Sequence, residues 1–493
     1  MKGLLRFELR AHALHSPGTE TFLAVYGLGE SEPESLNGNR PESFTKAGFT
    51  LVQELRRLLT ERHLVRAGSS RTTIVRCTPH DRFLRRLAVP VAFFYSKPLD
   101  APALIEGLAR ALGQVPIFAG RLRTTAGGLA IVCDDAGVAF STADVNLTCS
   151  GAMAAAMQTD APWLFEPLDA EEACAGRQPL LTIRLCRFTD GGAALGCSWH
   201  HAVGDMHTFM ILMRAWSAAV AGMPMPEPLI VENRTSYLLE HLPEEGAVRL
   251  AFRMLEAHEL SALERRAAEP EGDAMVHIHF SNTEIQRMRE AFGAATGERI
   301  SANDAICAHL TSVLRHWDEE PCERRVSITV NLRSRFGLDP ALLGNVLTWM
   351  HLASPAGEEP PQLAGRIRNA LARFAERHMD YRTSSRFLGD LSDARLAQCT
   401  FRAPGHFEST LLITNWSHFG MYDVAFGEQK PVFFAAAATG KPRPWNVVLV
   451  EGFGNTGLLC GGSFPAAWAR RLTSRQGQAL LHAFRDPREP STA

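Results

Sequence analysis

The stretch that decides the fold is Ser198-Trp199-His200-His201-Ala202-Val203-Gly204-Asp205, which joins two apolar segments of the chain. Residues 193–199 have the composition of a buried strand, and residues 206–220 are apolar over the length of a helix. A polar cluster between two buried elements is costly unless its groups are paired or used. The pattern therefore predicts an α/β unit in which a histidine pair lies at the end of a strand, facing a cleft.

His201 is the residue in this stretch best suited to chemistry. An imidazole can accept a proton at neutral pH and return it, as a general base must when a hydroxyl attacks a thioester carbonyl. Asp205 lies four residues later and can fix the turn through a charge pair. With 18 histidines in the chain, about one H-x-x-x-D is expected by chance. The local residues therefore leave two interpretations open, a catalytic histidine and a satisfied core histidine.

A metal site is a separate interpretation of the same residues. His200, His201, Asp205 and His207 could act as ligands, and His201 and Asp205 would lie one helical turn apart. No second cluster of ligands stands out elsewhere in the sequence. We therefore expect no metal, with this cluster kept as the alternative.

Composition limits the function classes. The chain has 493 residues, which favours two domains, and its 46% hydrophobic and 21% charged residues are ordinary for a globular protein. A formal net charge of −2 argues against nucleic acid and anionic membranes as partners. The ten cysteines contain no C-x-x-C pair, and the longest apolar run, Leu87 to Tyr95, is too short for a membrane span. We expect a cytoplasmic protein without a membrane span.

Strand and helix patterns occur in both halves of the chain, which predicts an α/β fold in two similar parts. A hairpin-like turn is expected at Asp134-Asp135, between strands at 128–133 and 137–140. Helices are expected at 44–64, 361–378 and 465–484. The predicted organisation is an N-terminal extension at 1–70, a first lobe at 71–225, a linker at 226–270 and a second lobe at 271–493.

Seven further segments resemble, in order, the signatures of the BAHD acyltransferases, which carry H-x-x-x-D and D-F-G-W-G motifs. Each matches a family signature only loosely, but together they extend the resemblance from about residue 77 to residue 465. The segments are Thr78–Asp81, Val115–Leu122, Cys133–Phe140, Asn331–Arg335, Gly344–Asn345, Thr414–Trp416 and Asp423–Gly427, the last followed by Lys430-Pro431.

The resemblance implies a two-domain chloramphenicol-acetyltransferase-like fold, with mixed sheets flanked by helices and an active site in a channel between the domains. His201 would be the general base, and Asp205 would point away from the site and pair with an arginine. The other residues implied are Thr414 and Trp416 beside the tetrahedral intermediate, and a structural ion-pair group of Arg333, Arg335 and Asp423. Lys441 and Arg443 follow Gly440 in a loop whose cations could reach the phosphates of acyl-CoA.

The implied reaction is transfer of an acyl group from acyl-CoA, a co-substrate, to an alcohol or amine of a small molecule. A monomer would act through a ternary complex, with no permanently bound cofactor; the chain has no G-x-S-x-G nucleophile motif. Two alternatives stay open. His200-His201 also fits a condensation-type catalyst that uses a carrier-protein donor. Met206 in place of glycine, with the altered 423–427 signature, also fits a non-catalytic relative.

Overall fold

The computed structural model describes residues 10–16, 19–25, 61–69, 72–158, 161–244, 250, 252–267, 272–401, 410–436 and 445–486. The chain forms two compact units, Met1–Leu58 and Leu59–Ala493. The first unit contains the antiparallel hairpin of β1 (Arg10–Ser16) and β2 (Thr19–Val25). The helix predicted at 44–64 falls outside the described residues up to position 60. For its last residues the prediction is wrong, because Arg62–Val65 forms strand β3, which pairs with β8.

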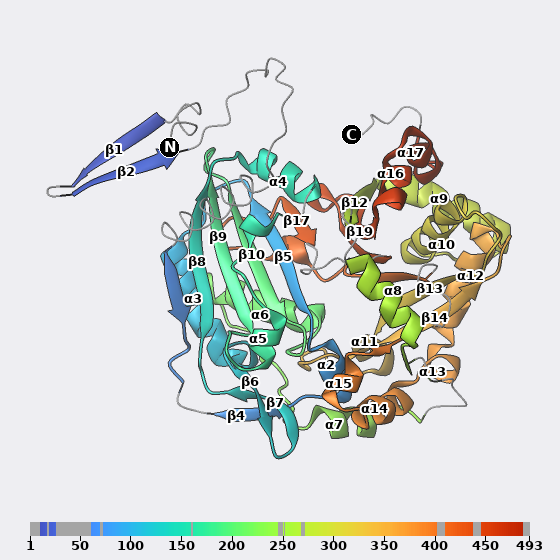
Figure 1. Ribbon diagram of the computed structural model, residues 1–493, viewed down its shortest axis with the longest axis horizontal. Helices are drawn as coiled ribbons and strands as arrows, with labels where there is room; N and C mark the ends of the chain where they lie inside the picture. Colours follow the sequence, from blue (N-terminus) through green and yellow to red (C-terminus); the bar gives the residue numbers. More distant parts are fainter. Residues whose placement is uncertain are drawn as a thin grey trace. The chain divides into compact units, whose positions relative to one another are not determined.

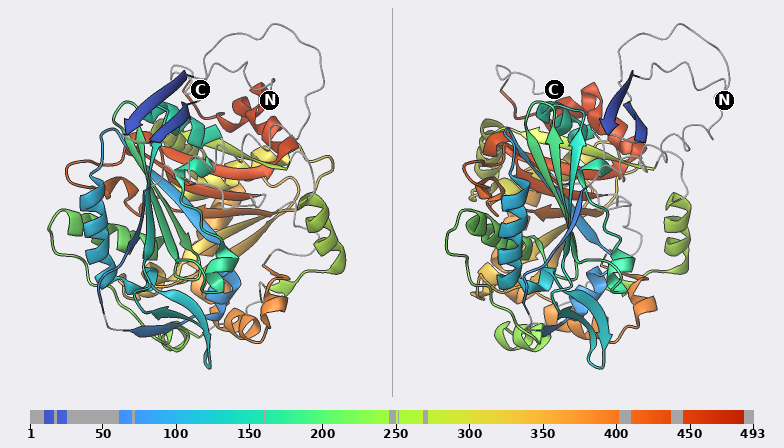
Figure 2. Two further views of the ribbon diagram at one scale, coloured as in Figure 1. Left: turned by 60° about the vertical axis from the view of Figure 1, so that its left-hand side comes forward. Right: turned by 90° about the vertical axis from the view of Figure 1, so that its left-hand side faces the viewer.

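Two six-stranded mixed sheets dominate residues 59–493, and helices cover both (Figures 1 and 2). In the first sheet, β8 and β9 are parallel, and the other neighbouring strands are antiparallel. Strand β10 lies inside this sheet, and all its residues are buried. Strands β9 and β10 form an antiparallel hairpin. The strand order is β17 (Phe433–Ala436), β5 (Ala88–Tyr95), β10 (Ala193–His200), β9 (Leu181–Phe188), β8 (Val138–Val145) and β3.

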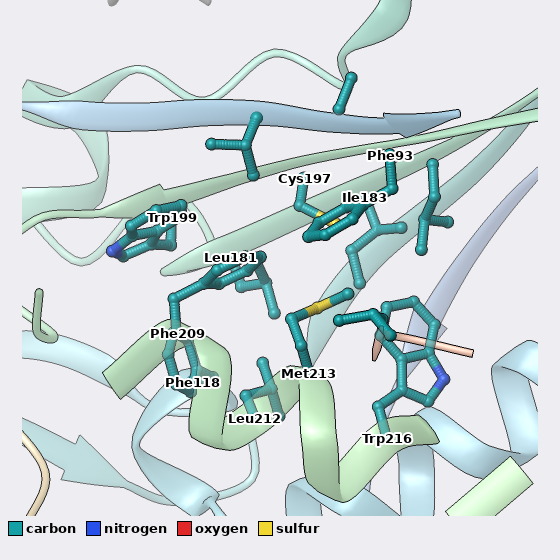
Figure 3. Packing of buried hydrophobic residues seen from close by; sticks show 14 of the residues in the cluster. Phe93, Phe118, Leu181, Ile183, Cys197, Trp199, Phe209, Leu212, Met213 and Trp216 are labelled. Atoms are coloured by element: carbon teal, nitrogen blue, oxygen red, sulfur yellow. The ribbon is translucent and has the colours of Figure 1, made fainter. Parts of the chain in front are cut away.

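The first hydrophobic core lies between this sheet and helix α6 (Met206–Val220), which packs against α3 (Ala101–Gln114). Figure 3 shows side chains of α6 pointing toward the strands, among them Phe209, Met213 and Trp216. Trp199 stacks on Phe209 with ring centroids 4.2 Å apart. The apolar helix predicted at 206–220 is confirmed. Through Phe209 it covers Trp199 near the end of β10.

The hairpin predicted at Asp134-Asp135 is wrong. Strand β7 (Gly128–Cys133) belongs to a small separate sheet with β4 (Thr73–Arg76) and β6 (Arg121–Thr125), whereas β8 joins the first sheet. Asp135 has a positive φ of 52°. Its carboxylate accepts hydrogen bonds from the backbone N–H groups of residues 67, 68 and 69. The turn therefore anchors a neighbouring loop and sends the chain into another sheet.

The second sheet is covered by α9 (Asn282–Thr296), α10 (Ala302–Arg315) and α12 (Pro360–Ala372). Side chains cap the first two of these helices, because Ser281 accepts from the Glu284 N–H and Ser301 forms a capping box with Asp304. The strand order is β12 (Asp273–Phe280), β19 (Leu458–Pro465), β18 (Asn446–Glu451), β16 (Thr410–Asn415), β13 (Arg324–Asn331) and β14 (Leu347–Ser354).

Two predicted helices are each divided in the structure. The first ends at Ala372, and α13 (Phe374–Arg377) follows. The second consists of α16 (Ala466–Thr473) and α17 (Arg475–Leu481). Ser474 has extended backbone angles between them, and its side chain accepts from the Gly477 N–H to cap α17. The shorter elements are α2 (Pro79–Leu84), α4 (Cys149–Gln158), α5 (Ala170–Cys174), α7 (Arg234–His241), α8 (Ala257–Ala267), α11 (Leu332–Phe336), α14 (Tyr381–Gly389), α15 (Asp393–Leu396), β11 (Arg253–Met254) and β15 (Cys399–Thr400).

The sheets do not follow contiguous stretches of sequence. Strand β17, from the predicted second lobe, pairs with β5 of the first sheet, and β3, from the predicted extension, lies at the opposite edge. The predicted linker at 226–270 contains helices α7 and α8. The first sheet therefore takes its two edge strands from outside the predicted first lobe, whereas the second sheet takes all its strands from residues 273–465. Among the described residues, no helix combines the length and apolar character needed to cross a membrane.

Candidate active site

The turn between β10 and α6 holds the two predicted catalytic residues. Strand β10 ends at His200 and α6 begins at Met206. Asp205 is the N-cap of α6, and its Oδ1 accepts the Thr208 N–H at 3.0 Å. Met206 is therefore the first residue of a regular helix, and its side chain is buried in the first core. The loss of glycine at that position is compatible with the observed backbone.

Asp205 forms a buried ion pair with Arg333, an arginine of the group that the family resemblance implied. Arg333 Nη1 lies 2.7 Å from Asp205 Oδ2, and its Nη2 lies 3.3 Å from Oδ1. The Val346 N–H donates to Oδ2 at 3.1 Å. Burial acts to raise the pKa of Asp205, but Arg333 and the hydrogen bonds outweigh it and hold that pKa below its usual range. The Asp205 carboxylate is therefore charged, and both of its oxygens contact Arg333.

The other two members of the predicted ion-pair group lie elsewhere. Arg335 donates to the Leu371 carbonyl and lies over the ring of Phe374 at 5.5 Å. Residues two apart on a helix do not share a face, so α11 turns Arg335 away from Asp205. Asp423 is exposed, and its Oδ1 lies 3.5 Å from Lys430 Nζ. The prediction that these two belong with Arg333 is wrong.

His201 is half-buried, and its main chain is held firmly. Its N–H donates to the Leu87 carbonyl at 2.8 Å, and its own carbonyl accepts from Asn345 Nδ2 at 2.7 Å. Its ring Nδ1 is buried with no hydrogen-bond partner among the described residues. Burial lowers the pKa of His201 below its usual 6.5, against the opposing effects of Asp205 and Asn345. The imidazole is therefore neutral at pH 7 and able to accept a proton.

The neighbouring His200 has a different role. Its Nε2 lies 3.1 Å from the Ala170 carbonyl, and its Nδ1 accepts from the Ala202 N–H at 3.2 Å. Burial lowers its pKa to about 4. Both ring nitrogens are thus occupied by backbone groups. His200 shapes the turn, and His201 is the member of the pair available for proton transfer.

The residues of the alternative metal site face different partners. His207 Nε2 lies 2.7 Å from the Pro340 carbonyl, His200 bonds to backbone, and Asp205 pairs with arginine. In the part of the chain that the structure describes, no group of three or more His, Cys, Asp and Glu side chains is arranged to hold a metal ion. The observed contacts thus give these side chains structural partners.

A second buried ion pair supports the turn, and the sequence did not reveal it. Arg234 Nη2 lies 2.8 Å from Asp81 Oδ2, with side chains 2% and 0% exposed. Arg234 also donates to the Val203 carbonyl at 3.2 Å, and Asp81 Oδ1 accepts from Asn345 Nδ2 at 2.7 Å. Asp81 belongs to one of the recognised motif segments, but Arg234 lies in the predicted linker, where no local pattern marks it.

Gly344 allows the second lobe to approach this turn closely. Its φ is +124°, and an added Cβ would lie 2.4 Å from Arg234 Nη1. Its N–H and its carbonyl both bond to Thr208 Oγ1, at 2.9 and 3.0 Å, and its carbonyl also accepts from Arg333. A side chain at this position is excluded by both the backbone angle and the packing. Residues 333–346, which belong to the predicted second lobe, therefore hold the turn in place through hydrogen bonds.

The remaining predicted residues lie on or near β16. Thr414 Oγ1 is 3.0 Å from Thr329 Oγ1, and Trp416 packs against the first core. Their place beside a tetrahedral intermediate stays a prediction, as does the channel between the lobes. Lys441 and Arg443 lie outside the described residues.

The altered second signature packs onto the first core through its backbone and its apolar side chains. Tyr95 donates to the Val424 carbonyl at 3.0 Å, and Ser217 donates to the Ala425 carbonyl at 2.5 Å. Phe426 meets Trp216 with ring centroids 4.9 Å apart. The changed residues keep an apolar packing surface, while the aspartate of the signature faces solvent.

A second H-x-x-x-D segment begins at His482 and ends at Asp486. His482 Nδ1 lies 3.0 Å from Glu284 Oε1 and 3.0 Å from Arg485 Nη2. Asp486 pairs with Arg287 at 2.5 Å. This imidazole is occupied by charged neighbours, so the spacing alone does not identify a base.

Comparison with known proteins agrees with the geometry. Residues 75–446, well over half of the chain, match the Transferase family. A curated relative, agmatine hydroxycinnamoyltransferase 1 of Oryza sativa subsp. japonica, is 26% identical over 415 residues, covering 80% of this chain and 90% of the relative.

Solved structures with the same fold include vinorine synthase, with a TM-score of 0.62 and 19% identity, covering 85% of this chain and 98% of that one. TRI101 of F. graminearum, complexed with ethyl coenzyme A, gives a TM-score of 0.68 at 15% identity, covering 83% and 98%. The predicted two-domain fold is confirmed. The chain therefore belongs to the Transferase family, the family of the BAHD acyltransferases, and it is an acyltransferase.

Proposed function

We propose that this acyltransferase moves an acyl group from acyl-CoA to a hydroxyl or amine of a small molecule, with His201 as general base. The observation that carries the proposal is an imidazole at the end of β10 whose main chain is fixed by hydrogen bonds and whose ring Nδ1 has no hydrogen-bond partner among the described residues. Its lowered pKa keeps it in the proton-accepting form at neutral pH.

The proposed reaction proceeds in one ternary complex. As the acceptor oxygen or nitrogen attacks the thioester carbonyl, its proton passes to His201 Nε2. The tetrahedral intermediate then collapses, the carbon–sulfur bond breaks, and the imidazolium returns the proton to the departing thiolate. Thr414 and Trp416 are proposed as the residues beside the intermediate. Donors placed at a developing oxyanion contribute about 3–4 kcal/mol in well-studied enzymes.

Asp205 acts in this proposal as a positioning residue. It caps α6 and receives hydrogen bonds from Thr208 and Val346 in addition to Arg333. With its oxygens engaged in this way, the carboxylate holds the turn and does not relay protons. Its contacts supply a reason for the four-residue spacing, because the N-cap of α6 and the base must lie on one short turn.

The donor and acceptor classes rest on relatives. The TRI101 structure contains ethyl coenzyme A, and the rice relative is named for agmatine, an amine. Amines are therefore the first acceptors to test, followed by alcohols. A carrier-protein donor is the competing possibility, and it requires a protein-bound thioester.

The test is thiol release from a panel of acyl-CoAs, each with amine and alcohol acceptors. We expect release that depends on both substrates, and a loss of about 10²- to 10⁴-fold in kcat/KM in His201→Ala. His482→Ala is the matched control, because it removes a histidine of the same spacing that contacts Glu284. Equal activity in His201→Ala and the native enzyme contradicts the proposal, and turnover with carrier-protein thioesters alone favours the competing donor.

A further inference from the structure

We infer that Arg325 and His351 bind a carboxylate carried by the acceptor, at the end of the acceptor that lies away from its reacting hydroxyl or amine. The inference rests on the proposed function and narrows the acceptor class to hydroxy acids and amino acids whose two polar groups are far apart. It begins from two nitrogen atoms, Arg325 Nε and His351 Nε2, which are buried without a hydrogen-bond partner among the described residues.

The two side chains lie on one face of the second sheet. Strands β13 and β14 are antiparallel neighbours, with Ser327 opposite His351 and Arg325 two residues before Ser327. Side chains alternate between the two faces of a strand, so all three share a face, and Arg325 is a diagonal neighbour of His351. Val326 points the other way and packs among residues of the covering helices α10 and α12. The pair therefore lies on the face turned away from those helices.

Each of the two side chains has one nitrogen bonded and another without a partner. His351 Nδ1 lies 2.8 Å from Ser327 Oγ. When this hydroxyl donates to Nδ1, the neutral ring carries its hydrogen on Nε2 and can donate it. Arg325 Nη2 lies 2.8 Å from Glu323 Oε1, and its Nε–H is a further donor. Buried donors without an acceptor are costly, and a group with two acceptor oxygens would satisfy both.

The charges around the pair favour an anion with a single negative charge. Burial lowers the pKa of His351 to about 4, and the charges of Arg325 and His378 act in the same direction. Glu323, the acid paired with Arg325, is 37% exposed, so water screens its charge. A carboxylate can accept from a guanidinium and an imidazole at once. A phosphate would bring two negative charges to one guanidinium, so we assign the site to a carboxylate.

The pair lies within reach of the position proposed for the reaction. Thr414 Oγ1 on β16 is 3.0 Å from Thr329 Oγ1, and Thr329 follows Ser327 by two residues on the same face of β13. A strand rises about 3.3 Å per residue and neighbouring strands lie about 4.8 Å apart, so Thr414 and His351 are separated by on the order of 12 Å. An acceptor of that length has its nucleophile at the reacting centre and its carboxylate at His351.

An apolar cluster that includes Leu87, Trp349 and Phe401 joins the pair to the catalytic turn. The Leu87 carbonyl accepts the His201 N–H at 2.8 Å, and the ring centroid of Phe401 lies 5.8 Å from that of His351. The body of the acceptor can therefore lie along apolar side chains between its two polar ends. Phe401 is only partly buried, and we expect its ring to turn aside as the carboxylate enters, as side chains commonly do on binding.

The strand order favours the acceptor over the acyl donor as the source of the carboxylate. The strands follow one another as β18, β16, β13 and β14, so β14 and β18 lie on opposite sides of β16. Lys441 and Arg443, whose cations are predicted to meet the phosphates of acyl-CoA, come just before β18 in the sequence. The donor would then approach from the side of β18, which leaves the side of β14 for the acceptor.

The experiment is isothermal titration calorimetry of the full-length enzyme with ω-aminooctanoate and with its methyl ester, which has the same chain without the negative charge. We expect the acid to bind about 10- to 100-fold more tightly than the ester, as hydrogen bonds to a charged group allow. Arg325→Met and His351→Phe should each remove most of this preference. Arg187→Met is the matched control and should keep it, because Arg187 is 47% exposed and pairs with Asp144 on the first sheet.

The preference is a ratio of two dissociation constants, so a partial loss of folded protein in a variant does not change it. Equal binding of acid and ester to the native enzyme overturns the inference, and so does the absence of measurable binding of the acid. A preference that persists in both Arg325→Met and His351→Phe also overturns it, because the carboxylate would then be bound elsewhere.

Turnover identifies which substrate supplies the carboxylate. We expect kcat/KM to favour ω-aminooctanoate over its ester, with a preference that is lost in Arg325→Met, and to differ little between succinyl-CoA and butyryl-CoA. A preference for succinyl-CoA that is lost in Arg325→Met, with no preference between the two acceptors, would assign the site to the donor and overturn the inference.

The proposed function and this inference fail separately. If His201→Ala keeps full activity, the proposed function fails, while the calorimetric preference for the acid remains measurable. If His201 is essential but acid and ester bind equally, the inference fails and the assignment of His201 stands.

Discussion

The chain contains two H-x-x-x-D segments, and the structure treats them in opposite ways. At His201 the aspartate meets a buried arginine whose side chain is 2% exposed, and the ring Nδ1 has no partner among the described residues. At His482 the aspartate meets Arg287, which is 39% exposed, and the ring lies between Glu284 and Arg485. Both aspartates are paired with an arginine, so the difference lies in the imidazole, which contacts charged neighbours at His482 but has an unpartnered Nδ1 at His201.

This comparison shows that the same spacing can occur in two different structural settings. The first segment lies between a fully buried strand and a buried helix, where the opposite lobe supplies Arg333, Gly344 and Asn345. The second follows the short helix α17 near the end of the described chain. Contacts from a distant part of the sequence therefore distinguish the turn at His201 from the segment at His482.

The largest expected effect is in Arg333→Met. Removing the arginine leaves Asp205 charged and buried, which costs about 3–5 kcal/mol in unfolding free energy. Urea denaturation measures it, alongside Arg335→Met. Arg335 is on the same short helix as Arg333 and lies over the ring of Phe374 in α13, so its loss should cost about 0.5–1 kcal/mol. Similar losses in the two variants would mean that the buried pair does not hold the turn.

An intermediate effect is expected in Gly344→Ala. The residue has φ +124°, and the new methyl group would meet Arg234, so we expect a loss of about 1–3 kcal/mol and reduced kcat. Gly337→Ala is the control, because Gly337 also has a positive φ, of 64°, but an added Cβ meets nothing within 4 Å. Thermal unfolding and kcat distinguish them. Only the first variant should impair turnover per folded molecule.

The smallest effect is expected in Asp486→Asn. Its partner is substantially exposed, so the pair should contribute about 0.2–1 kcal/mol. We expect kcat/KM to stay within about twofold of the native value. A large loss of activity measured by thiol release would show that the second segment takes part in the reaction, and the comparison would then fail.

Much of the site follows from local sequence. The strand, turn and helix at 193–220 were predictable because apolar runs of strand and helix length flank a polar turn. Arg333 was predictable from the resemblance of its segment to a family signature. Arg335 was placed wrongly by the same resemblance, because a motif records residue types and not the face of a helix that each one occupies.

Other features required the three-dimensional structure. Arg234 and Asp81 lie 153 residues apart, and an ion pair at that separation leaves no local pattern. Strand β17 joins the first sheet from residues 433–436 because it completes an open edge at β5, a tertiary preference that periodicity does not record. Asn345 was visible as part of a motif, but the two acceptors of its side-chain amide, Asp81 and the His201 carbonyl, come from other segments of the chain.

The most direct test of the account is the pH dependence of kcat/KM, measured with an acceptor that does not titrate between pH 4 and 8. His201 is active when neutral, and burial lowers its pKa, so the rate should fall as the pH drops through a midpoint below about 6.5. The residual rate of His201→Ala should lack this inflection. A native profile without it, or the same inflection in the variant, would contradict His201 as the base.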